Sequence, residues 1–220
     1  MPNKKEKFVI VDGNALLHRA WHALPPLTTQ RGEVVNAVYG FMMVFLKMLG
    51  EIKPDYLAVA WDRREPTFRH KIFKEYKAQR EKQPDELYQQ IGRIKRLLDV
   101  FNVPNFEKAG YEADDIIATL VNLTPETNIQ DIIMTGDLDA LQLVDSSTKV
   151  YTLRKGITDT VIYDEKAIQE RYGLTPQQLI DFKALRGDPS DNIPGVPGIG
   201  EKTALDLIKT FDSIEKLYQA

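Results

Sequence analysis

The sequence has no cysteine, and among its 220 residues are only three histidines. Without cysteine the chain cannot form disulfides, thiolate zinc sites or a cysteine nucleophile, and it suits a reducing compartment. His18 and His22 are four residues apart, as in zinc sites, but no third ligand accompanies them. We therefore expect a structural or substrate-side role for both histidines.

Long hydrophobic runs are also missing. The apolar run Phe8–Val11 ends at Asp12, too early for the hydrophobic part of a signal peptide. The next run, Ala37–Leu46, is well short of the roughly 20 residues that a membrane helix needs. These absences predict a soluble, cytoplasmic protein without a membrane partner.

Charge is unevenly distributed along the chain. The net charge is −3, yet the stretch from Arg63 to Lys82, hereafter the basic segment, holds eight basic and three acidic residues. It carries +5 and leaves −8 on the remainder, which fits bases that hold phosphates and acids that hold cations. Lys74, Lys77 and Arg80 recur every three residues, which predicts a shared helical side. A solvated charged helix is the plainer alternative.

Strand and helix patterns alternate along the first 172 residues. Continuous apolar runs predict buried strands at Phe8–Asp12, Tyr56–Asp62 and Asp131–Thr135, with others near 103–107, 149–153 and 159–163. Helices are expected over 14–22, over 36–51 with Asn36 as cap, over about 84–101, and from Glu112. The third of these has one apolar stripe, made of Ile91, Ile94, Leu97, Leu98 and Phe101. The alternation predicts an α/β fold, a mostly parallel sheet with helices on both faces.

The chain becomes helical and rich in glycine after Asp164. We expect a domain boundary near 172–175, with Thr175 as a helix cap, which gives domains of 1–172 and 173–220. The stretch Gly195–Gly200, the glycine hairpin, precedes a predicted helix at Ala204–Thr210. Glycines and a helix start can hold a phosphate closely, although a tight turn between helices is the alternative.

Acidic residues follow three of the predicted strands, open one helix and occupy the loop before the glycine hairpin. The nine carboxylates are Asp12, Asp62, Glu112, Asp114, Asp115, Asp137, Asp139, Asp188 and Asp191. Because the carboxyl ends of parallel strands meet at one edge of a sheet, we expect them to converge. Taken singly, each has an ordinary alternative, namely helix capping or turn formation.

Convergence would be costly without cations. Two carboxylates about 4 Å apart repel by about 1 kcal/mol in water and about 4 kcal/mol at an effective dielectric constant of 20. Oxygen ligands without cysteine or histidine select Mg²⁺ or Mn²⁺, and nine carboxylates exceed the need of one ion. Two or more ions could generate hydroxide and clamp a scissile phosphate.

Motifs across nearly the whole chain resemble, in order, the 5′ nuclease domain of bacterial DNA polymerase I, within the flap endonuclease superfamily. The matching blocks are Val11–Asn14 with Arg19, Ala37–Phe41, Phe68–Arg69, Tyr76–Lys77 with Arg80, Tyr111–Ile116, Thr135–Asp139 with Gln142–Leu143, and Gly187–Thr203. The resemblance implies a resolvase-like or PIN-like core with a helical arch or clamp near 66–84. It also implies a helix–three-turn–helix over about 184–210.

The resemblance also implies roles for individual residues. All nine carboxylates occupy metal-binding positions, and the residues expected to be catalytic are Asp12, Lys77, Arg80 and Asp115. DNA-binding positions are Arg19, Arg69, Tyr76, Lys77, Arg80, Gly195, Gly198, Gly200 and Lys202. Mg²⁺ or Mn²⁺, in two or more ions, is the implied cofactor, with K⁺ at the glycine hairpin, and Tyr76 could stack on a base.

The implied activity is that of a 5′-3′ exonuclease and flap endonuclease acting on DNA and RNA primers in replication and repair. A metal-activated water would leave 5′-phosphate products on branched, nicked or flapped duplex DNA with a 5′ single strand. The implied setting is a cytoplasmic, nucleoid-associated monomer with a covalently linked polymerase region. Three alternatives remain: a non-catalytic DNA clamp, a phosphohydrolase or receiver-type domain, and an RNA-directed nuclease.

Overall fold

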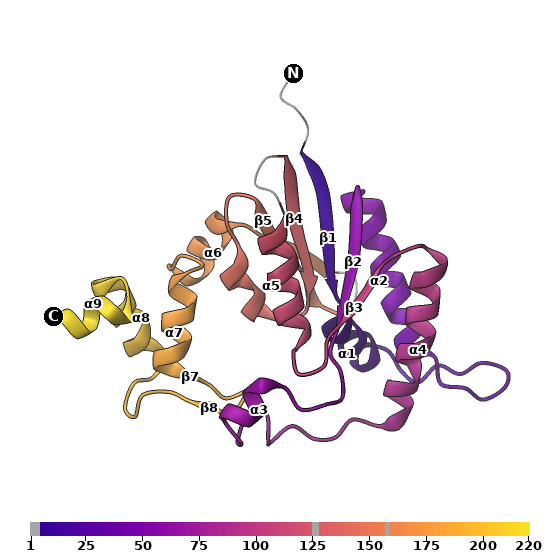
Figure 1. Cartoon of the computed structure of the whole chain (residues 1–220), viewed down its shortest axis with the longest axis horizontal. Coiled ribbons are helices and arrows are strands. Elements are labelled where there is room, and N and C mark those ends of the chain that lie inside the picture. The colour runs from indigo at the N-terminus through magenta and orange to yellow at the C-terminus, as the bar shows by residue number, and fades with distance from the viewer. Residues whose placement is uncertain (1–4, 125–127, 157–158) are drawn as a thin grey trace.

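A six-stranded sheet forms the centre of the protein (Figure 1). The computed structural model describes residues 5–124, 128–156 and 159–220. Residues 1–4, 125–127 and 157–158 of the predicted 1–172 domain lie outside the described residues. The strands are β1 (Glu6–Asp12), β2 (Tyr56–Trp61), β3 (Asn105–Glu107), β4 (Ile129–Thr135), β5 (Thr148–Lys155) and β6 (Asp159–Tyr163). Their order is β3-β2-β1-β4-β5-β6, and all neighbours are parallel except β5 and β6.

Helices cover both faces of the sheet. On one face lie α1 (Gly13–Ala23), α2 (Asn36–Ile52) and α4 (Asp85–Val100); on the other lie α5 (Ala113–Leu123), the 3₁₀ helix η1 (Leu138–Leu143) and α6 (Glu165–Tyr172). Alternate residues of β1 face opposite sides of the sheet. Val9 and Val11 pack in the core with α1, α2 and α4, whereas Ile10 packs in the core with α5, η1 and α6. The predicted α/β fold is confirmed, because strands buried on both faces need helices on both sides.

The end of the chain is helical, with α7 (Gln178–Arg186), α8 (Glu201–Phe211) and α9 (Ile214–Gln219). Thr175 and Gln178 exchange hydrogen bonds across the turn before α7, as expected of a helix cap. Between α7 and α8 the strands β7 (Gly187–Asp188) and β8 (Ile193–Pro194) form a small antiparallel pair. This pair was not predicted, because two residues give too short a pattern.

Two expectations about the helices are wrong. Asn36 does not cap α2; its side chain is buried and donates a hydrogen bond to the carbonyl oxygen of Trp21 at 3.3 Å. On α4, Ile94 and Leu98 are buried, whereas Leu97 is 36% exposed. Phe101 lies just past the end of α4 and is 48% exposed. The apolar stripe of α4 is therefore narrower than the sequence pattern indicated.

The basic segment is helical only over α3 (Phe68–Ile72), so the predicted shared helical side of Lys74, Lys77 and Arg80 is wrong. Lys77 has a φ of 55°, in the left-handed region, which a continuous helix does not allow. Its amide donates to the carbonyl oxygen of Asp191 at 3.0 Å, so contacts with the β7–β8 loop replace helical hydrogen bonds. Figure 1 shows α3 beside that loop.

Within the described residues, none of the helices has the length and apolar character needed to cross a bilayer.

Candidate metal centre and nucleic-acid interface

The site lies where the strand order reverses. From β1 the chain proceeds to β2 on one side, whereas β4 and β5 lie on the other side, so the connections diverge at the carboxyl ends of β1 and β4. Such a switch point leaves a crevice in an open α/β sheet. Asp12, the last residue of β1, is buried there. Its Oδ1 accepts a hydrogen bond from the Ala15 amide at 2.9 Å and its Oδ2 accepts one from the Thr135 hydroxyl at 2.8 Å.

Four of the nine carboxylates repel one another at this edge: Asp12, Asp62, Asp114 and Asp137. Burial, with the charges of Asp62 and Asp137, raises the pKa of Asp12 to about 6. Burial, with the charges of Asp12, Asp137 and Asp62, raises the pKa of Asp114 to about 8. Within the described chain, none of the four forms an ion pair with lysine or arginine. The charges of Lys77 and Arg80 offset that of Asp62 in part, and Lys77 likewise that of Asp114, yet burial and repulsion still raise the pKa of both acids.

The other five carboxylates are paired with basic side chains. Arg69 binds both oxygens of Asp115, at 2.7 and 2.8 Å, and Lys77 lies 2.9 Å from Glu112. Arg80 lies 2.5 Å from Asp191. Three of these basic residues belong to the basic segment, which therefore folds directly onto the acidic edge.

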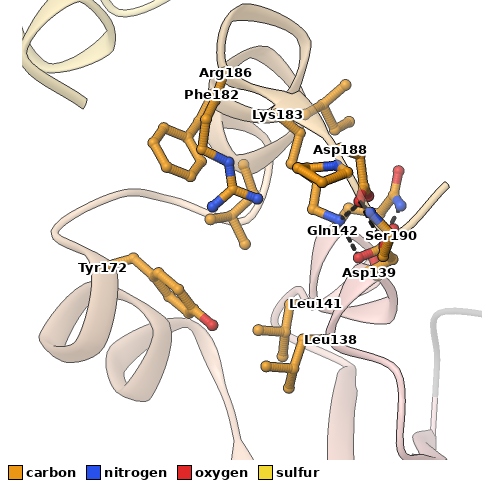
Figure 2. Close-up of a pocket in the computed structure, with 13 residues that line it drawn as sticks. Leu138, Asp139, Leu141, Gln142, Tyr172, Phe182, Lys183, Arg186, Asp188 and Ser190 are labelled. Carbon is orange, nitrogen blue, oxygen red and sulfur yellow. Dashed lines mark hydrogen bonds and ion pairs between the residues drawn. The ribbon is translucent and has the colours of Figure 1, made fainter. Parts of the chain in front are cut away.

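Lys183 of α7 forms ion pairs with the remaining two carboxylates, Asp139 and Asp188. Its ammonium donates to Asp139 and, at 2.9 Å, to Asp188, as Figure 2 shows. Although burial alone would raise it, the pKa of Asp188 is lowered to about 2, because Ser190 and Lys183 both donate to the carboxylate. The ammonium of Lys183 thus lies between two of the carboxylates and offsets the charge of both.

Two adjoining hollows collect these groups. One, of about 460 Å³, is lined by Glu112, Asp114, Asp115, Asp139, Asp188 and Asp191, together with Arg69, Tyr76 and Lys183. The other, of about 800 Å³, shares Glu112 with the first and reaches Asp62, Lys77 and Arg80 below the basic segment. Seven of the nine carboxylates line these two hollows. The other two, Asp12 and Asp137, are close enough for their charges to act on Asp114, so all nine belong to one edge of the molecule.

Among the described residues, no three acidic or histidine side chains are spaced to hold a metal ion as they stand. Five of the carboxylates are turned toward lysine or arginine instead. The chemistry of the donor set nevertheless fits a divalent cation. Its donors are carboxylate oxygens, as Mg²⁺ and Mn²⁺ prefer. A cation would favour the charged forms of Asp12 and Asp114, which burial and, to a smaller extent, mutual repulsion disfavour.

Two of the residues expected to bind DNA point inward. Tyr76 is 5% exposed, and its hydroxyl donates to Glu112 at 3.0 Å and to Asp191 at 3.1 Å. The expectation that this ring stacks on a base is not met in this arrangement, because the ring is buried edge-on against His70. Arg19 donates to the carbonyl oxygen of Leu153 at 2.6 Å, so its guanidinium is bound to β5.

None of Gly195, Gly198, Gly200 and Lys202 lines either acidic hollow, although Ile193, two residues before the glycine hairpin, lines the smaller one. Gly195 passes so close to α7 that a Cβ atom there would lie 2.3 Å from the carbonyl carbon of Arg186. Gly198 has a φ of 85°, Gly200 is the residue before α8, and Lys202 is exposed in the first turn of α8. The hairpin thus links β8 to the start of α8.

Sequence reasoning missed Lys183 and the two hydroxyl residues that orient carboxylates, Thr135 and Ser190. A signal existed for each. Thr135 ends a predicted strand beside Asp12's strand, Ser190 lies in the acidic loop, and Lys183 is five residues before Asp188. Only the fold shows which acid each one contacts.

Both parts of the chain match families of known proteins. Residues 7–173 match the family described as "5′-3′ exonuclease, N-terminal resolvase-like domain". Residues 174–220 match the family described as "5′-3′ exonuclease, C-terminal SAM fold". The chain belongs to the 5′-3′ exonuclease family. It is a nuclease, and the resemblance inferred from its motifs is confirmed.

Curated relatives of the nuclease are DNA polymerases I of bacteria. The protein from Bacillus subtilis is 49% identical over 217 residues, which are 99% of this chain and 25% of that protein. The one from Caldicellulosiruptor bescii is 47% identical over 215 residues, with 97% and 25% covered. The nuclease chain thus spans about a quarter of the length of these relatives.

Solved structures share the fold of the nuclease. The T5 5′-exonuclease with bound zinc ions has a TM-score of 0.76 at 24% identity, covering 97% of this chain and 79% of that one. The catalytic core of Rad2 in complex with DNA substrate has a TM-score of 0.60 at 21% identity, covering 97% and 64%. At these identities the likeness concerns the fold.

Proposed function

We propose that this nuclease hydrolyses phosphodiesters of branched, nicked or flapped duplex DNA, and of RNA primers, from a 5′ single strand, leaving 5′-phosphates. It would act as a 5′-3′ exonuclease and flap endonuclease in replication and repair, with two or more Mg²⁺ or Mn²⁺ ions. One observation carries the proposal: four mutually repelling carboxylates at the switch point, beside five others paired with lysine or arginine.

The nine carboxylates would hold the divalent ions. When bound, such ions lower the pKa of water and offset charge on the scissile phosphate. The chain orients the acids in advance. Asp12 is fixed by Ala15 and Thr135, and the Asp62 carboxylate accepts a hydrogen bond from the Ala113 amide at 2.6 Å. Fixed carboxylates lose little conformational freedom when a cation binds them.

The basic side chains of the basic segment would exchange their carboxylate partners for phosphate. Lys77 and Arg80, with expected catalytic roles, can exchange Glu112 and Asp191 for phosphate oxygens once divalent ions neutralise these acids. Asp115, also assigned to catalysis, holds Arg69 by two hydrogen bonds. For Tyr76 and Arg19, contact with DNA would require release from their present hydrogen bonds.

The rest of the substrate would be held by the second part of the chain. The helix start after Gly195, Gly198 and Gly200 offers free amides to a duplex phosphate, Lys202 adds a charge, and carbonyl oxygens of the hairpin could hold K⁺. A division into a 1–172 nuclease domain and a 173–220 DNA-binding domain, the latter with its helix–three-turn–helix, is supported by the family matches.

The setting proposed for the nuclease is cytoplasmic and close to the bacterial nucleoid. A covalently linked polymerase region is supported by the relatives, which are DNA polymerases I about four times as long as this chain. We propose that the nuclease acts as a monomer.

Cleavage of a labelled 5′ flap in Mg²⁺ tests the activity. We expect products with a 5′-phosphate, and a failure to cut in both Mg²⁺ and Mn²⁺ would refute the proposal. Parallel substrates with RNA in the 5′ strand, and an RNA duplex without DNA, would separate this nuclease from an RNA-directed one.

Asp114→Asn separates the nuclease from a DNA clamp. We expect cleavage to fall by on the order of 100-fold or more, because a direct ligand should matter at least as much as groups behind it. Without metal the variant should be more stable than the wild type at neutral pH, since burial and the neighbouring acids penalise ionisation of Asp114 and an asparagine does not ionise. Glu170→Gln, an exposed acid of α6, is the matched control. Unchanged cleavage in Asp114→Asn would contradict the assignment.

A further inference from the structure

Three aromatic side chains line a hollow on the outer side of α5. Phe68, Phe106 and Tyr111, together with Lys108 and part of α5, line a hollow of about 630 Å³, hereafter the aromatic groove. The three rings are 38%, 41% and 43% exposed, respectively. Asp115 and Ala118 line both this groove and the smaller acidic hollow, so the two hollows adjoin at α5.

The chain builds this groove from two distant segments. The amide of Phe68, at the start of α3, donates to the carbonyl oxygen of Gly110 at 3.0 Å, in the loop between β3 and α5. This bond places the rings of Phe68 and Tyr111 with centroids 5.8 Å apart and planes inclined by 57°. The pair is therefore set by the backbone and remains open to solvent.

Cations accompany both rings. The guanidinium of Arg69 lies 4.6 Å from the centroid of Phe68, and the ammonium of Lys108 lies 5.1 Å from that of Tyr111. Lys108 forms no ion pair with any residue in the described part of the chain, so its charge is available to a ligand. Cations placed on aromatic rings contribute most where the rings are partly shielded from water.

The acids that face the groove are already neutralised. Glu107 is paired with Lys95 at 2.6 Å, and Asp115 with Arg69. A phosphate entering the groove would meet Lys108 without an unpaired carboxylate opposite it. Exposed rings beside available positive charge are the combination by which proteins bind single-stranded nucleic acid.

We propose that the aromatic groove is a base-stacking subsite for one unpaired nucleotide of the substrate's single strand. This inference rests on the proposed function. Bases within a duplex cannot present their faces, so the subsite selects an unpaired base, with Tyr111 and Phe68 as the stacking surfaces. The phosphate of that nucleotide lies toward Lys108, and Asp115 marks the path to the acidic hollow.

Photo-crosslinking tests the position directly. A single 5-iodouracil, placed in turn at each position of an unpaired 5′ strand, is irradiated with the wild-type chain in EDTA so that nothing is cut. We expect cross-linked peptides containing Tyr111 or Phe68 for a narrow range of positions. Cross-links confined to other peptides overturn the proposal.

Binding measured by anisotropy in EDTA tests the contribution of stacking. Loss of one stacked base is worth roughly 1–3 kcal/mol, so Tyr111→Leu should weaken binding of DNA with a 5′ overhang by at least about fivefold. Blunt duplex should bind unchanged. Tyr111→Phe keeps the ring and should bind as the wild type does, and Tyr56→Leu, an exposed tyrosine at the other end of the sheet, is the control.

The outcomes separate this inference from the proposed function. If Tyr111→Leu binds overhang DNA as tightly as the wild type, the subsite is wrong, whether or not the nuclease cuts a flap. If the wild type fails to cut in Mg²⁺ and Mn²⁺, the nuclease proposal fails while the cross-linking result stands by itself.

Discussion

A buried carboxylate far from the site offers a quantitative test of the electrostatic reasoning. Asp131 belongs to β4, is 2% exposed, and faces Thr148 across the β4–β5 register. Its Oδ1 and the Thr148 hydroxyl oxygen have no hydrogen-bond partner in the described part of the chain. Burial, with a smaller effect of the Asp145 charge, raises the pKa of Asp131 from 3.8 to about 6.

This pKa fixes the sign and size of an effect on stability. The folded state binds the proton more tightly than the unfolded state, so the stability it contributes is present below pH 3.8 and is lost as the pH rises through about 6. With about 1.4 kcal/mol for each tenfold change in acidity, the charged form costs up to about 3 kcal/mol at pH 7. Asp131→Asn, which cannot ionise, should be stabilised by up to that amount.

Urea unfolding followed by tryptophan fluorescence measures the difference in EDTA, where no ion binding contributes. We expect the free energy of unfolding of Asp131→Asn to exceed that of the wild type at pH 7.5, with the gain shrinking toward zero near pH 4. Asp206→Asn, an exposed acid on α8, should change stability by less than about 0.5 kcal/mol at either pH. A gain that does not vary with pH, or a loss at pH 7.5, would refute the reasoning.

Two further predictions concern the site and the hairpin. Lys183→Ala removes the ammonium from Asp139 and Asp188, so the affinity for Mn²⁺, measured by calorimetry, should rise several-fold. Unchanged or weaker binding would contradict the view that the ammonium competes with a divalent cation. Gly195→Ala should melt at a lower temperature and lose affinity for blunt duplex DNA, because the added Cβ atom would overlap the end of α7. Gly200→Ala has open space for its Cβ atom and should melt like the wild type. Equal melting temperatures of the two variants would show that the close approach at Gly195 is unimportant.

The sequence by itself determined the sheet and the convergence of the acids. Apolar runs such as Phe8–Val11 are local patterns, and strands buried on both faces must lie between helices. Once β1 and β4 are parallel neighbours, Asp12 and Asp137 must emerge at the same edge. These conclusions need only periodicity and chain direction, both of which are written along the sequence.

The tertiary structure decided how the charges are paired. Spacing predicted one helical side for Lys74, Lys77 and Arg80, yet the structure places Lys77 against Glu112 and Arg80 against Asp191. These partners lie 35 and 111 residues away, and Tyr76 is buried for the same reason, since its hydroxyl has carboxylate partners there. A side chain with several possible partners takes the one that the packed backbone brings within reach, and no local pattern encodes that distance.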